Sequence, residues 1–139
     1  MSADRRSSTV AIRAYVATVI LLAVAALSLA FQYGPELDFK ASGLLAFSIA
    51  GLALELSAHR MRSGTATASI GFIVFLGSAL VFGPPWGALI TCLCIGGAQV
   101  LNRKRPLRIA FNVAQHGLAL LAGAGVYQLL GGHFPPEHI

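Results

Sequence analysis

The sequence has 139 residues, of which 56% are hydrophobic and 11% are charged. A soluble domain carries about 25% charged residues, and so small a fold has a large surface for so few polar groups to cover. The composition therefore argues against a soluble domain and favours a membrane protein. The net charge of +5 could indicate nucleic acid as a partner, but the basic residues lie in short clusters between apolar runs, as in membrane topology signals. No nucleic acid is expected.

Five apolar segments approach the length of about 20 residues that a membrane-spanning helix needs. We therefore predict an all-α fold: one integral membrane domain over residues 1–139, built as a polytopic transmembrane helical bundle of about five spans. The lipid bilayer is its expected surroundings. The predicted helices cover approximately residues 12–31, 41–58, 65–82, 86–101 and 109–130.

The first segment has two interpretations. Arg5 and Arg6 precede its apolar run, and Ser28-Leu29-Ala30 resembles the cleavage site of a secretory signal peptide. The apolar run extends through Phe31, which is longer than most signal-peptide cores. A retained helix is the favoured interpretation.

Glu55, in the second segment, is the only acidic residue within an apolar run. An ionisable group inside a membrane is costly and marks a functional candidate, for example the coupling acid of a small transporter. His59 follows four residues later and shares its helix face, with Arg60 and Arg62 close by. An ion pair at the membrane interface is the structural interpretation of the same residues.

The third and fourth segments are connected only by Gly83-Pro84-Pro85-Trp86-Gly87. Proline has no N–H to donate, and it disfavours helical backbone in the residue before it. This predicts a tight turn between two helices. Because the fourth segment is short, the pair could also form a re-entrant hairpin, whose non-helical backbone would need protein around it.

Cys92 and Cys94 both lie in the fourth segment. Two cysteines inside one apolar run are too few and too buried to form a disulfide framework. Residues two apart diverge by about 200° around a helix, so no zinc site is expected from them. Small residues also recur four positions apart, a spacing that lets helices approach closely. The two stripes are Ser42, Ala46 and Ala50 in the second segment, and Ala88, Cys92 and Gly96 in the fourth.

The start of the fifth segment is the most polar part of the apolar runs. Asn112, Gln115 and His116 stand at i, i+3 and i+4, so they share one helix face. Their side chains need hydrogen-bond partners in lipid. They could bind another helix, line a ligand pocket or form a proton path, and helix contact is the favoured interpretation. No metal is expected, because His116 is alone in its segment.

Basic residues predict the orientation of the chain, since loops rich in lysine and arginine stay in the cytoplasm. With five spans, nine of the ten basic residues lie on one side and Lys40 alone lies on the other. The prediction is a multi-pass protein of the bacterial inner membrane with a cytoplasmic N-terminus. The nine are Arg5, Arg6, Arg13, Arg60, Arg62, Arg103, Lys104, Arg105 and Arg108.

Catalytic motifs are absent from the sequence. It contains no Walker A sequence, no G-x-S-x-G motif and no dinucleotide-binding glycine pattern. A general acid or base would have to come from Glu55 or His116 alone. We expect no enzyme activity, no catalytic residues, no cofactor and no metal.

Five short motifs follow one another from the second predicted helix onward. They are Gly51-Leu52-Ala53-Leu54-Glu55, Phe82-Gly83-Pro84-Pro85, the basic residues 103–108, Ile109-Ala110-Phe111-Asn112-Val113-Ala114-Gln115 and Val126-Tyr127-Gln128-Leu129-Leu130-Gly131-Gly132. Their order and spacing resemble the N-terminal membrane-sensor region of bacterial HD-GYP and GGDEF signalling proteins. That resemblance implies a membrane sensor coupled to cyclic di-GMP turnover. The sequence has no HD, GYP or GGDEF motif, so the catalytic activity is not implied.

These observations give a leading functional hypothesis. The chain is expected to be a non-catalytic membrane sensor or regulatory module that acts in a larger assembly. Its partner would be a second copy or a downstream signalling subunit. A ligand would lie between helices near Asn112, Gln115 and His116. The alternatives are a small oligomeric transporter that uses Glu55 as its coupling acid, and a purely structural membrane subunit.

Overall fold

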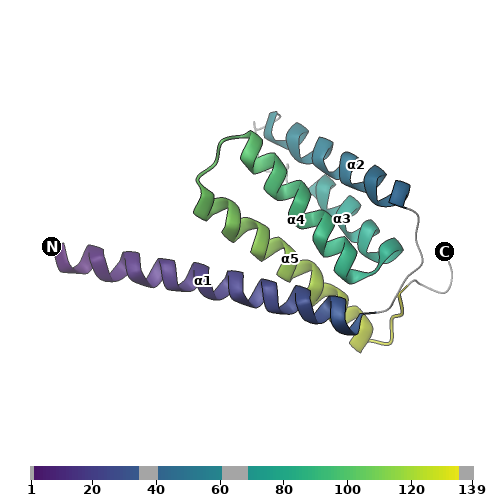
Figure 1. The fold of residues 1–139 in the computed structure, drawn as a ribbon, viewed down its shortest axis with the longest axis horizontal. Coiled ribbons are helices and arrows are strands. Elements are labelled where there is room, and N and C mark those ends of the chain that lie inside the picture. The colour runs from purple at the N-terminus through teal and green to yellow at the C-terminus, as the bar shows by residue number, and fades with distance from the viewer. Residues whose placement is uncertain (1, 35–40, 61–68, 135–139) are drawn as a thin grey trace.

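A computed structural model describes residues 2–34, 41–60 and 69–134 of the chain. Within these residues the fold is all-α, as predicted, and has no strand. Figure 1 shows the helices running back and forth, with the N-terminal end of α1 extending beyond the others. The five helices are α1 (Ser2–Tyr33), α2 (Ala41–Arg60), α3 (Ser69–Phe82), α4 (Pro84–Leu101) and α5 (Pro106–Leu129).

Three helices are long and apolar enough to cross a membrane: Val10–Tyr33 in α1, α4 and α5. The described apolar parts of the other two helices, Ala41–Ser57 and Gly71–Phe82, are shorter. Residues 61–68, which include the predicted start of the third segment, lie outside the described residues. Spanning length is therefore shown for three of the five predicted helices.

The predicted turn between the third and fourth segments is confirmed at Gly83. Its φ of 82° and ψ of 160° fall in a region that essentially only glycine adopts. Pro84 and Pro85 do not separate the helices as expected, because they form the first turn of α4. Proline suits this position, since the first N–H groups of a helix have no partner within it. The fourth helix thus begins at Pro84 and not at Trp86.

The core of the fold surrounds α4, which packs against each of the other four helices. Aromatic side chains fill the space beside it: Phe47 of α2 meets Phe82 of α3 edge to face, with ring centroids 5.2 Å apart. Trp86 of α4 meets Phe31 of α1 in the same way at 5.3 Å. The buried hydrophobic cluster comprises Phe75, Ala79, Phe82, Ala88, Ile90, Cys94, Ile95 and Leu120.

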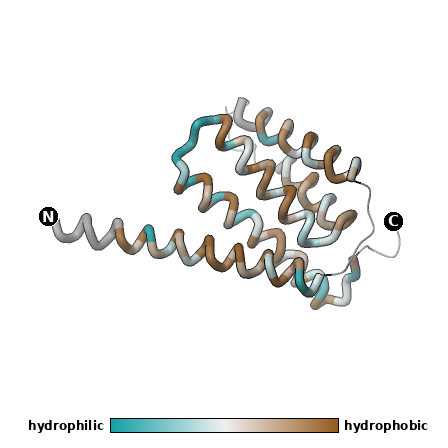
Figure 2. The backbone as a smooth tube through the Cα atoms, viewed as in Figure 1, coloured by the Kyte–Doolittle hydropathy of each residue, from teal (hydrophilic) through white to brown (hydrophobic). Residues whose placement is uncertain are grey.

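Apolar side chains also cover much of the outside of the bundle. Leu21 is 69% exposed, Ile73 68% and Leu93 61%. A water-soluble monomer rarely presents large continuous apolar patches, whereas lipid favours such a surface. Figure 2 shows a continuous run of strongly hydrophilic residues at the α4–α5 connection, near the end of the bundle from which α1 extends.

Candidate functional site

The α4–α5 hairpin carries a hydrogen bond between side chains of two different helices. The Nδ2 atom of Asn112 donates a hydrogen bond to Oε1 of Gln99 over 3.1 Å. Gln99 is only 8% exposed and lies in the last turn of α4, whereas Asn112 lies near the start of α5. An interhelical hydrogen bond of this kind contributes about 0.6–2 kcal/mol in a membrane.

Sequence reasoning did not select Gln99. Its signal was nevertheless present, because Gln99 is the only side-chain amide within the fourth predicted helix. It was overlooked because it lies close to the polar and basic residues that follow this helix. Only the return of the chain through α5 shows that the side chain of Gln99 points toward Asn112.

Gln115 and His116 are exposed, unlike the partly buried Asn112 one turn before them on α5. Nδ1 of His116 is 2.8 Å from the carbonyl oxygen of Asn112 in its own helix. A carbonyl can only accept, so Nδ1 carries the hydrogen, and Nε2 of a neutral ring remains an outward-facing acceptor. Asn112 is therefore satisfied inside the chain, while Gln115 and His116 present polar groups on its outer surface.

Glu55 is half-buried on α2. It faces α3, because a Cβ atom built on Gly71 would lie 2.7 Å from Oε1 of Glu55. The glycine thus leaves room for the carboxylate between the two helices. The predicted ion pair with His59, Arg60 or Arg62 involves side chains outside the part of the chain that the structure describes.

The two cysteines face different helices, as their spacing predicts. The thiol of Cys92 approaches the carbonyl oxygen of Val113 in α5 at 3.7 Å. The thiol of Cys94 donates to the carbonyl oxygen of Ser48 in α2 at 3.3 Å. Among the described residues, no group of three or more His, Cys, Asp and Glu side chains could hold a metal ion. The geometry therefore gives both cysteines a packing role.

The two stripes of small residues differ in what they contact. The α4 stripe faces α5: a Cβ on Gly117 would lie 2.9 Å from Sγ of Cys92, and one on Gly96 would lie 3.3 Å from Val113. The predicted close approach is thus seen between α4 and α5. The α2 stripe is exposed, and its members are Ser42, Ala46 and Ala50.

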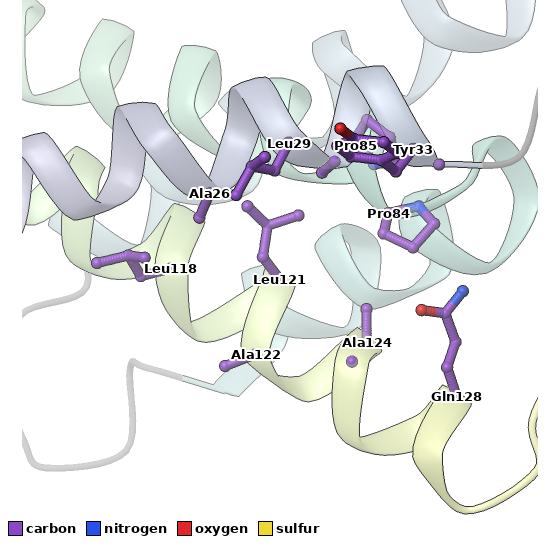
Figure 3. A pocket seen from close by; sticks show the side chains of 13 residues that line it. Ala26, Leu29, Tyr33, Pro84, Pro85, Leu118, Leu121, Ala122, Ala124 and Gln128 are labelled. Carbon is purple, nitrogen blue, oxygen red and sulfur yellow. The ribbon is translucent and has the colours of Figure 1, made fainter.

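Two cavities lie along the seam between α1 and α5, with α4 beneath them. One has a volume of about 510 Å³ and reaches Tyr33 and Gln128. The other has a volume of about 330 Å³ and is almost entirely apolar. Leu121 lines both. Figure 3 shows the larger cavity between α1, the start of α4 and α5. Neither cavity is lined by the predicted site residues Asn112, Gln115, His116 and Glu55.

No protein-family model, curated protein or solved structure matches this chain significantly.

Proposed function

We propose that this chain is a non-catalytic sensor or regulatory module of the bacterial inner membrane, which works by docking against another transmembrane helix in a larger signalling assembly. The observation that carries the proposal is the exposure of Gln115 and His116 on α5. Both residues lie in a helix that is long and apolar enough to cross a membrane.

The depth of these two residues supports docking. Arg108 lies at the basic end of α5, and Gln115 follows it by seven residues, which corresponds to about 10 Å along a helix. The hydrocarbon core of a bilayer is about 30 Å thick, so Gln115 and His116 lie well inside it. Exposed polar side chains at that depth need partners other than lipid tails.

The chemistry of the two side chains suits a partner helix. The amide of Gln115 offers both donors and an acceptor, and Nε2 of His116 offers an acceptor when the ring is neutral. Both can therefore bind polar side chains of a second copy or of a different subunit. The basic loop at residues 103–105 precedes α5, and it fits a cytoplasmic position for this end of the helix. The N-terminus of α1 lies toward the same end of the bundle (Figure 1).

The test is the mass of the purified full chain in mild detergent, measured by light scattering for wild type, Gln115→Leu and Asn112→Leu. We expect the wild type to associate and Gln115→Leu to dissociate. Asn112→Leu is the matched control, because its partner Gln99 belongs to the same chain, and it should retain the mass of the wild type. A wild-type chain that stays monomeric, well folded and unaffected by Gln115→Leu would contradict docking on a second copy. Docking on a different subunit would be contradicted if the wild type and Gln115→Leu retain the same membrane proteins after crosslinking in native membranes.

A small transporter is a second candidate, and the half-buried carboxylate of Glu55 between α2 and α3 favours it. Ionisable residues inside membranes often mark ion or proton pathways. Proton-dependent flux into vesicles that contain the purified chain, abolished by Glu55→Gln, would support the transporter. If the chain is a sensor and not a transporter, neither the wild type nor the Glu55→Gln variant should produce flux. The substitution should then leave membrane insertion and folding intact.

A further inference from the structure

The two cavities between α1 and α5 have dimensions that match a lipid chain. The larger one is bounded along α5 by Leu118 and Gln128. Ten residues of helix correspond to about 15 Å, which is half of the about 30 Å of a bilayer's hydrocarbon core. The smaller cavity continues past Leu121 toward Ala110, through the other half. The volumes of about 510 and 330 Å³ both fall in the range of ligand sites, about 300–1,000 Å³.

We propose that the larger cavity is a binding site for one acyl chain of a zwitterionic phospholipid, with the headgroup beside Tyr33 and Gln128. This inference is independent of the proposed sensor function, because it rests on α1 and the far end of α5 and not on Gln115 or His116. The occupant belongs to the leaflet at the C-terminal ends of α1 and α5.

The lining of the cavity determines which part of a lipid lies where. Leu29, Leu118 and Leu121 line its body, and apolar side chains of this kind match methylene groups. Tyr33 and Gln128 line one end, where a hydroxyl and an amide can hydrogen-bond to ester and headgroup oxygens. In Figure 3 the side chain of Gln128 extends from α5 toward the side of the cavity that carries Pro84.

Charge selects the class of headgroup. None of the described residues that line either cavity is charged. An anionic phosphate group with no balancing charge is bound by clusters of lysine and arginine, which this lining lacks. A zwitterionic headgroup carries its own positive charge and needs only hydrogen bonds. The lining therefore fits phosphatidylethanolamine better than phosphatidylglycerol.

Water and empty space are poorer occupants of the same volume. Water needs two to four polar partners in a cavity, and the body of this one is apolar. A void beside α1 would leave the surrounding side chains without contacts that close packing normally supplies. The apolar molecules available in a bilayer are lipid chains. The cavity lies at the junction of α1 and α5, and both helices are long and apolar enough to span a bilayer.

The test uses the fluorescence of Trp86, the single tryptophan of the chain, which follows the cavity-lining Pro85. The full chain in detergent micelles is titrated with phosphatidylethanolamine brominated near the headgroup end of its acyl chain, since bromine quenches indole fluorescence at short range and Trp86 neighbours the lining without belonging to it. We expect quenching to saturate at about one lipid per chain, as for a single defined site.

Variants of α1 supply the matched comparison. Ala26 lines the cavity, so Ala26→Phe fills it and should weaken the apparent affinity about tenfold. Ala25 is exposed and absent from the lining, so Ala25→Phe should leave the affinity unchanged. Gln128→Leu should weaken binding because it removes a hydrogen-bonding group from the headgroup end.

Three results would overturn the proposal. The first is quenching in the wild type that rises with the lipid content of the micelle and never saturates. The second is tighter binding of brominated phosphatidylglycerol than of phosphatidylethanolamine. The third is protection of Trp86 by dimer formation, which would make a second copy the occupant. Native mass spectrometry of the wild-type chain does not depend on the folding of any variant, and it should show a retained phosphatidylethanolamine; its absence would also count against the site.

Discussion

At the residue scale, the hydrogen bond between Gln99 and Asn112 is the contact whose removal is easiest to interpret. Replacing either residue by leucine leaves the other amide without its partner, which costs about 1–3 kcal/mol. Replacing both removes the two polar groups together, so the double variant should be less destabilised than the sum of the single variants. The measurement is the free energy of unfolding in mixed detergent for the four proteins of the cycle. Strict additivity would show that the bond contributes nothing.

Gly87 gives a second prediction at the same scale. A Cβ atom on Gly87 would lie 2.6 Å from the Cβ of Ala79 in α3, closer than two carbon atoms can approach. Gly87→Ala should therefore push α3 and α4 apart and cost about 1–3 kcal/mol, measured as a fall in the melting temperature in detergent. The matched control is Gly123→Ala, since nothing lies within 4 Å of that position. An equal loss in both variants would point to a general effect of glycine replacement.

The polar residues of α5 show how far the sequence leads at this scale. Their residue types and apolar surroundings predict that Asn112, Gln115 and His116 need partners. They do not predict which partner each finds, because Asn112 reaches Gln99 only after the chain has reversed between α4 and α5. The two cavities were also beyond the sequence, since they arise where α1 crosses α5 and no local pattern encodes that crossing.

At the scale of elements, the turn between α3 and α4 depends on one backbone conformation. Gly83 has a φ of 82° and a ψ of 160°, and a side chain there costs about 1–3 kcal/mol. Gly83→Ala should lower the melting temperature in detergent clearly. Pro84→Ala should have a smaller effect, because alanine is also accepted in the first turn of a helix. If Pro84→Ala proves the more harmful, the prolines and not the glycine define the turn.

Helix ends were predicted well where glycine or a run of basic residues follows the helix, and poorly where no such residue marks the boundary. The end of α3 at Phe82 and the end of α4 at Leu101 agree with the sequence, because glycine and a basic loop follow them. α1 begins at Ser2, ten residues before its predicted start at Ile12. Hydropathy marks the apolar part of a helix only, and polar residues can extend the same hydrogen-bond ladder into water.

At the scale of the whole molecule, the distribution of charge predicts the topology. A reporter inserted after Arg62 should be cytoplasmic and one fused after Ile139 periplasmic, because a chain of five spans puts nine of its ten basic residues on the cytoplasmic side. Phosphatase and fluorescent-protein fusions measure the two sides independently. A cytoplasmic signal after Ile139 would contradict five spans and favour a re-entrant pair formed by α3 and α4.

The position of α4 between the other four helices has a consequence for membrane insertion during synthesis. α1 has a mean hydropathy of 2.4 across its span, whereas α4 has 1.3 and includes the buried polar residues Thr91 and Gln99. A helix of modest hydropathy gains less from partitioning into lipid on its own, and α4 finds its apolar contacts on the four helices around it. During synthesis, α4 is therefore expected to remain at the insertion channel until α5 emerges, so that the α4–α5 hairpin enters the bilayer as one unit with its amide pair already formed.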